Sequence, residues 1–155
     1  YIVSEHKTMK GVVYDRDPVA AVAGEFIKNY GMEDRVGAVG GNYLVDDFGS
    51  GYDLVWASAT LNFARNDLDC LITRIFSSIN NGGYFLSFQE GMTAEMTRPD
   101  NMLDWLGSLL SAGVDFRLAQ GEVADSMLRC GFSHVRSMTL STPMGQMDLD
   151  IARKH

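Results

Sequence analysis

The stretch from Gly11 to Pro18 reads Gly-Val-Val-Tyr-Asp-Arg-Asp-Pro, and it contains the junction that decides the fold. Gly11 to Asp15 is a short apolar run that ends in an acid, which is typical of a buried strand. Asp17 and Pro18 follow, a good helix-capping residue and a proline suited to a first helical turn. The junction therefore predicts a strand that passes directly into a helix.

The same alternation of helix and strand continues along the chain. Apolar residues recur at helical spacing in two segments, which predicts helices at Val19–Tyr30, with Gly31 as its C-terminal cap, and at Leu68–Ile79. Short apolar runs predict three strands, at Arg35–Gly40, Tyr52–Ser58 and Tyr84–Phe88. Parallel strands need crossovers of a dozen or more residues, which helices usually supply. The pattern therefore predicts the α/β class, with a mostly parallel sheet and helices on both faces.

The last third of the sequence changes character. Asn81-Gly82-Gly83 is expected to end the preceding helix, and an unusually apolar helix is expected at Met102–Leu110. A shorter helix is predicted at Glu122–Cys130. Val135–Leu140 and Met147–Ala152 flank a turn and predict an antiparallel strand pair at the sheet edge. Without an internal repeat or a long linker, residues 1–155 are expected to form one domain.

Composition excludes several classes of function. The formal net charge of −7 and the absence of clustered Lys and Arg argue against a nucleic-acid partner. No apolar stretch approaches the roughly 20 residues of a membrane span, and the histidines and cysteines lack the spacing of a metal site. Cys70 and Cys130 lie among apolar neighbours, so we expect buried free thiols and a reducing, cytoplasmic location.

Five stretches together resemble the C-terminal domain of small-molecule O-methyltransferases, the family that includes plant phenolic and acetylserotonin-type enzymes. They are Lys10–Asp15, Val39–Tyr43, Tyr52–Val55 continuing to Leu61-Asn62, Asn81–Tyr84, and Glu122–Phe132. The resemblance implies a Rossmann-like class I methyltransferase fold, S-adenosylmethionine as cofactor, a small-molecule substrate, and a homodimer in the full-length protein. Methionines between Met92 and Met102 would then roof the substrate site, although ordinary core packing is an equal alternative.

Asp15 is the candidate that physical reasoning supports independently. An acid at the carboxyl end of a strand in a parallel sheet faces the crevice where nucleotides bind, and its two oxygens can accept both hydroxyls of a ribose. The alternative is that Asp15 caps the helix or faces solvent.

The remaining cofactor residues follow from the resemblance. It implies that Arg16 lies beside the adenine ring, that Asn42 and Tyr43 lie near the adenine amino group, and that Ser58 lies near the methionine portion. Asn42 stands where the family has an aspartate, so it would accept only a neutral hydrogen bond. Alternatively, Asn42 forms a turn and Ser58 closes its strand.

Two departures from the family affect the site. The family's glycine-rich loop and first strand would precede Tyr1, so we expect strands Gly11–Asp15 and Tyr52–Ser58 not to pair with each other. Asn62 replaces the histidine that acts as general base, while Gln89 and Arg117 replace the glutamates that orient it. Asn62 therefore remains a candidate for contacting substrate.

Three hypotheses follow. The first is S-adenosylmethionine-dependent methyl transfer to a small organic molecule, either to an atom that is already nucleophilic or by alignment alone. The second is an inactive methyltransferase-like domain kept for binding or assembly. The third, a dinucleotide-dependent oxidoreductase, is disfavoured by the terminal antiparallel pair.

Overall fold

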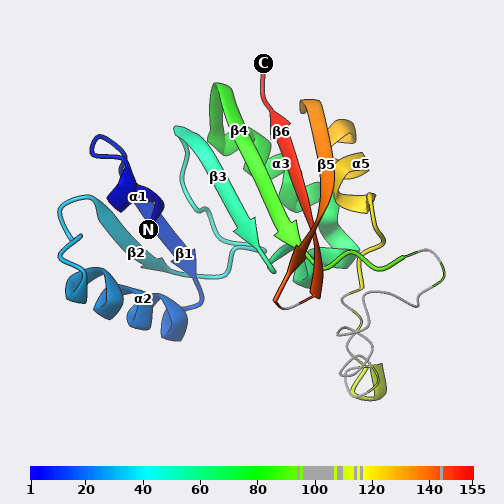
Figure 1. The fold of residues 1–155 in the computed structure, drawn as a ribbon, viewed down its shortest axis with the longest axis horizontal. Helices are drawn as coiled ribbons and strands as arrows, with labels where there is room; N and C mark the ends of the chain where they lie inside the picture. The colour runs from blue at the N-terminus through cyan, green and yellow to red at the C-terminus, as the bar shows by residue number, and fades with distance from the viewer. Residues whose placement is uncertain (94, 96–106, 108–109, 114, 116, 144) are drawn as a thin grey trace. The chain divides into compact units, whose positions relative to one another are not determined.

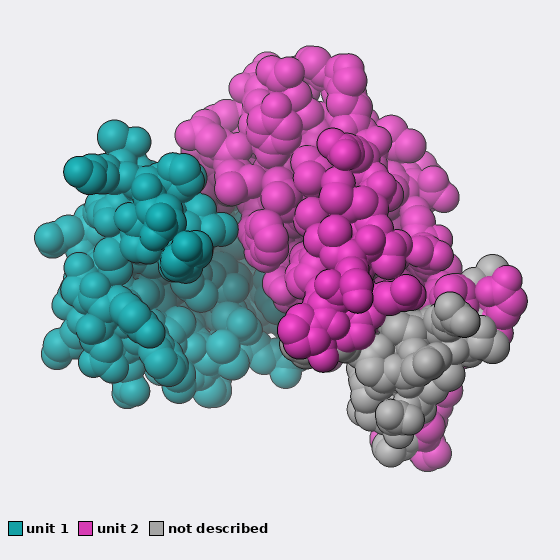
Figure 2. All heavy atoms as spheres, viewed as in Figure 1, with its two compact units in different colours: residues 1–49 teal, residues 50–155 magenta. Residues whose placement is uncertain are grey.

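The computed structural model describes residues 1–93, 95, 107, 110–113, 115, 117–143 and 145–155. The chain divides into two compact units, Tyr1–Gly49 and Ser50–His155, which Figure 2 colours separately. That residues 1–155 form a single domain stays a prediction.

The first unit is a parallel strand pair connected by a helix. Its elements are α1 (Ile2–Glu5), β1 (Gly11–Asp15), α2 (Asp17–Asn29) and β2 (Val36–Gly40) (Figure 1). β1 and β2 pair in parallel, from Gly11 opposite Val36 to Asp15 opposite Gly40. Pro18 lies in the first turn of α2, and Gly31 has the left-handed φ of 61° that suits a helix terminus. The predicted junction between strand and helix is confirmed.

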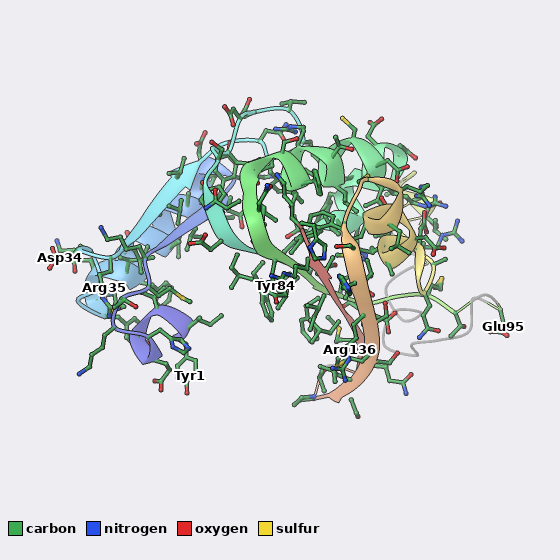
Figure 3. All side chains as sticks on the ribbon, turned by 90° about the horizontal axis from the view of Figure 1, so that it is seen from above. Tyr1, Asp34, Arg35, Tyr84, Glu95 and Arg136 are labelled. Atoms are coloured by element: carbon green, nitrogen blue, oxygen red, sulfur yellow. The ribbon has the colours of Figure 1, made fainter. Side chains whose placement is uncertain are left out.

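Arg35 fastens α1 to the rest of this unit. Its Nη1 donates to the backbone carbonyls of Val3 at 2.7 Å and of His6 at 3.0 Å. Figure 3 labels Arg35 beside Asp34, and labels Tyr1, the residue before α1, separately. One guanidinium thereby satisfies carbonyls that a helix this short leaves without partners.

The second unit is a four-stranded mixed sheet with helices. Its elements are β3 (Tyr52–Ser58), η1 (Leu61–Asp67), α3 (Leu68–Ser78), β4 (Ile79–Gln89), α5 (Glu122–Arg129), β5 (Ser133–Thr142) and β6 (Gly145–Arg153). The strand order is β3-β4-β6-β5 (Figure 1). β3 and β4 are parallel, whereas β6 runs antiparallel to both of its neighbours. The predicted α/β class and the C-terminal antiparallel pair are confirmed.

The core of the second unit lies between one face of this sheet and α3 with α5. Phe85 on β4 is fully buried, and its ring lies 5.7 Å from that of Phe132, which follows α5. Phe132 also meets Phe76 of α3 edge to face at 4.9 Å. Aromatic pairs in this geometry add to the stabilisation that burial provides.

β1 and β3 belong to different sheets, as the sequence predicts. Each is an end strand, since β1 pairs with β2 and β3 pairs with β4 among the described strands. Apolar side chains lie along both, and Val12 and Trp56 are about half exposed. A strand with one unpaired edge is a place where a further strand can pair.

The expectation that Asn81-Gly82-Gly83 ends the preceding helix is wrong. β4 begins at Ile79, directly after α3, and the three residues lie inside the strand. The pairing with β3 shifts there, from Tyr52 opposite Ile79 to Leu54 opposite Tyr84. A Cβ on Gly83 would lie 2.8 Å from the carbonyl oxygen of Asp53, so the glycine permits an irregularity in the strand rather than a turn.

Both cysteines are free, as expected, but they are not buried. Cys70 is exposed and Cys130 is half-buried. Cys70 lies on the face of α3 away from the buried stripe of Leu71, Ile72 and Ile75, a distinction that its apolar neighbours in sequence conceal.

The predicted helix at Met102–Leu110 lies largely outside the described residues. Within the described part of the chain, no helix has the length and apolar character needed to cross a membrane.

Candidate functional site

Asp15 is the last residue of β1 and is half-buried. Its Oδ1 accepts a hydrogen bond of 2.7 Å from the backbone N–H of Arg16, just before α2. No described residue donates to its Oδ2. One carboxylate oxygen of Asp15 is thus engaged with the backbone just before α2, and the other has no donor among the described residues.

Arg16 and Tyr43 lie close enough to Asp15 for their charges to interact. Burial raises the pKa of the Tyr43 phenol above its ordinary value of 10.0, the positive charge of Arg16 opposes this shift, and the negative charge of Asp15 adds to it. The backbone N–H of Gly41 donates to the carbonyl of Asp15 at 2.9 Å and joins the ends of β1 and β2. The structure therefore brings together three of the predicted cofactor residues.

Asn42 forms the turn that follows β2. Its Oδ1 accepts from the backbone N–H of Leu44 at 3.1 Å, and its own N–H donates to Asp46 Oδ2 at 2.7 Å. The alternative given by the sequence, that Asn42 serves a turn, is correct for its side-chain oxygen. Its side-chain NH₂ remains as a donor, because no described residue accepts from it.

Tyr14 and Asp46 also belong to this end of the first unit, and sequence reasoning missed both. A Cβ on Gly41 would lie 2.1 Å from the Tyr14 hydroxyl oxygen and 3.3 Å from Asp46 Oδ2, so these side chains pack closely over the glycine. The Tyr14 ring meets Phe48 edge to face at 6.1 Å. Gly40-Gly41 in the sequence is the signal for this close approach.

A groove of about 450 Å³ lies elsewhere in the first unit, between α2 and β2. Asp17, Ile27, Glu33 and Val36 are among the residues that line it, whereas Asp15, Asn42 and Tyr43 are not. The groove is therefore separate from the predicted cofactor residues.

Ser58 belongs to the second unit, where it is the exposed last residue of β3. Its carbonyl accepts from the hydroxyl of Thr60 at 2.8 Å. Ala59, between them, has a left-handed φ of 47°, which is unfavourable for a residue with a Cβ. Ser58 closes its strand, and the chain turns sharply after it.

Asn62 and Gln89 are both buried in the second unit, with 6% and 3% of their surfaces exposed. Asn62 Oδ1 and Gln89 Oε1 have no hydrogen-bond partner in the described part of the chain. Neither side chain can accept a proton, so these two residues do not replace the missing base.

Arg117 stands where the family has the second glutamate that orients the base, and it forms an ion pair with Asp115. Its Nε and Nη2 each lie 2.8 Å from Asp115 carboxylate oxygens, and Arg65 of η1 contacts the same carboxylate. The hydrogen bonds from Arg117, aided by the charge of Arg65, hold the pKa of Asp115 well below its usual range. Arg117 thus neutralises an acid instead of orienting a base.

The sequence matches no protein-family model, and it matches no curated protein significantly. Solved structures share its fold. They include PigF with SAH (20% identity, TM-score 0.81), an O-methyltransferase family protein from Burkholderia thailandensis (18%, 0.81), and an O-methyltransferase family 2 protein from Planctomyces limnophilus DSM 3776 in complex with apigenin (20%, 0.80). Each match covers 99% of this chain and 46% of the other, so the chain spans about half the length of the structures it matches. The chain shares the fold of the part of these structures that it matches.

Proposed function

We propose that this chain is the cofactor-binding part of a methyltransferase that transfers a methyl group from S-adenosylmethionine to a small organic molecule. The observation that carries the proposal is the arrangement around Asp15. An acid at the carboxyl end of a parallel strand keeps one oxygen for a ligand, with Arg16 and Tyr43 beside it. The fold shared with methyltransferases supports the same reading.

The residues of the first unit fit an adenosine. Asp15 Oδ2 would accept from the ribose hydroxyls, and Arg16 and Tyr43 would flank the adenine ring. Asn42 would donate through its NH₂ to a ring nitrogen, because its oxygen already serves Leu44. S-adenosylmethionine supplies a methyl group on a sulfonium, which makes the methyl carbon electrophilic.

The second unit would hold the substrate. Ser58, at the end of β3, is proposed to contact the methionine portion, and Asn62 to contact the methyl acceptor. Because neither Asn62 nor Gln89 can take a proton, this chain would contribute position and alignment, which alone supply several kcal/mol of rate acceleration. The full-length protein is proposed to be a homodimer, as the resemblance implies, and to be cytoplasmic, which the two free cysteines suit.

Calorimetric titration of S-adenosylhomocysteine into the full-length polypeptide tests the proposal, with Asp15→Ala as the variant. Loss of hydrogen bonds to a charged acceptor is expected to weaken binding roughly tenfold to a hundredfold. Asp34→Ala removes an exposed acid from the turn before β2 and serves as the control, with unchanged affinity expected.

Unchanged affinity in Asp15→Ala would remove Asp15 from the site. No binding to the folded wild-type protein would refute the methyltransferase proposal and favour the second hypothesis, a domain kept for binding or assembly.

A further inference from the structure

Two buried amide oxygens of the second unit, on Asn62 and Gln89, have no hydrogen-bond partner among the described residues. Both side chains are more than nine-tenths buried. Buried polar atoms in folded proteins nearly always have a partner, whether protein, water or ligand. Two such oxygens in one region therefore indicate a bound group that donates hydrogen bonds.

The backbone places the two residues at the same end of the β3–β4 pair. The N–H of Ala59 donates to the carbonyl of Phe88 at 2.9 Å. Gln89 is the next residue after Phe88, and Asn62 follows Ala59 by three residues, a span of about 10 Å at most. Gln89 is thus the last residue of β4, and Asn62 lies four residues after the end of β3, at the carboxyl ends of two parallel strands, where α/β proteins bind their ligands.

The surroundings of Gln89 add negative charge. Asp148 on β6 lies directly opposite Gln89 in the antiparallel register and is 9% exposed. Its Oδ1 accepts from Thr139 at 2.7 Å and from Gln120 at 3.4 Å, while its Oδ2 packs against Gly91. A carboxylate and two amide oxygens attract N–H and O–H donors, while the positive charge of Arg65, on the same η1 as Asn62, is paired with Asp115.

These features distinguish between possible methyl acceptors. A hydroxyl offers one hydrogen and becomes a strong nucleophile only after a base removes it. A neutral primary amine offers two N–H groups, one for each orphan oxygen, and keeps its lone pair for attack. Amide oxygens accept such hydrogen bonds without any change of protonation.

We propose that Asn62 Oδ1 and Gln89 Oε1 bind the amino group of a neutral primary amine, and that this nitrogen is the methyl acceptor. The inference rests on the proposed function. In the transfer, the nitrogen lone pair forms the N–C bond while the methyl–sulfur bond breaks with its electron pair going to sulfur, and the excess proton on nitrogen then passes to water.

The test uses the full-length polypeptide saturated with S-adenosylhomocysteine. A panel of amine and alcohol pairs on identical one-ring and two-ring skeletons, such as aniline with phenol and 1-aminonaphthalene with 1-naphthol, is measured by saturation-transfer NMR and competition. Amines are expected to bind more tightly than the matched alcohols.

The variants are Asn62→Leu and Gln89→Leu, each expected to weaken amine binding roughly threefold to tenfold through loss of one hydrogen bond. Asn66→Leu removes an exposed amide from the same 3₁₀ helix, η1, and is the matched control, with no effect expected. Asn62→Asp keeps an acceptor oxygen and is expected to retain amine binding.

Normal binding of S-adenosylhomocysteine together with equal or tighter binding of the alcohols, or with no amine bound, would overturn the inference and leave the proposed function standing. Unchanged amine binding in both leucine variants would overturn it as well. If a leucine variant does not fold, the comparison of amines with alcohols on the wild type still decides. Failure of the wild type to bind S-adenosylhomocysteine would instead refute the proposed function.

Discussion

Replacing Asp150 by Asn is expected to stabilise the protein at pH 8. Asp150 lies on β6 and is 3% exposed. Burial is the main cause that raises the pKa of its carboxyl above 3.8; the hydrogen bond from Ser137 opposes the shift, and the charge of Asp148 adds to it. The ionised form is therefore costly in the folded state. Asn keeps the acceptor for Ser137 and offers an NH₂ to the hydroxyl of Ser87, which lies opposite and has no partner in the described part of the chain.

The sign of the pH dependence follows from the raised pKa. The folded state binds the proton more tightly than the unfolded state, so the stabilising contribution is complete below pH 3.8 and is lost as the pH rises through the folded-state pKa. Each unit of raised pKa corresponds to about 1.4 kcal/mol. We therefore expect the free energy of unfolding of Asp150→Asn to exceed that of the wild type at pH 8, by about 1.4 kcal/mol for each unit by which the pKa is raised, and this excess to shrink as the pH falls through the folded-state pKa.

Urea unfolding of the full-length protein at pH 5 and pH 8 measures both differences. Asp34→Asn, which changes an exposed acid, is the control and should leave the free energy of unfolding nearly unchanged. If Asp150→Asn proves less stable than the wild type at pH 8, the carboxylate makes favourable interactions in its ionised form, and the argument from burial is refuted.

Gly83→Ala is expected to reduce the free energy of unfolding by about 1–3 kcal/mol, because its Cβ would lie 2.8 Å from the backbone carbonyl oxygen of Asp53. Gly37→Ala has open space around its Cβ and is the control in the same urea experiment; equal effects would contradict the steric argument. Hydrogen bonds from Arg129 above all lower the pKa of Asp69 to about 2, so the stability that this pair adds is lost as the pH falls from 3.8 towards 2. Arg129→Gln should return the pKa of Asp69 towards 3.8 in a carboxylate NMR titration, and an unchanged pKa would mean that another group sets it.

Local signals in the sequence predict elements well where one residue type has one structural use. Tyr52 and Ser58 bound β3 as expected, and Pro18 lies in the first turn of α2. The prediction that Asn81-Gly82-Gly83 ends a helix was wrong because glycine occurs both in turns and in irregular strands. Only the pairing with β3 distinguishes the two, and the sequence does not show it. The prediction that Cys70 is buried was wrong because burial on a helix depends on which face of the helix packs against the sheet.

Some features of the candidate site could also be predicted from the sequence, and others could not. Asp15, Arg16 and Tyr43 could be grouped from the sequence, since a known fold brings the ends of neighbouring parallel strands together. The engagement of Asn42 with Leu44 could not, because a local hydrogen bond competes with the ligand for the same oxygen. Nor could the sequence show that no described residue donates to the oxygens of Asn62 and Gln89, because that depends on the neighbours that folding brings to them.

Ala59, in the turn that leads from β3 to Asn62, has an unfavourable backbone conformation. A left-handed φ at a residue with a Cβ is unfavourable by about 1 kcal/mol, and here it is held by the Ala59–Phe88 hydrogen bond and by the hydroxyl of Thr60 on the Ser58 carbonyl. The same turn directs the chain into η1, where Asn62 is buried. The strained turn and the two acceptors without a partner among the described residues each lower stability, and all three lie at the same end of the β3–β4 pair. We infer that these features are kept because the two oxygens bind a ligand that donates hydrogen bonds.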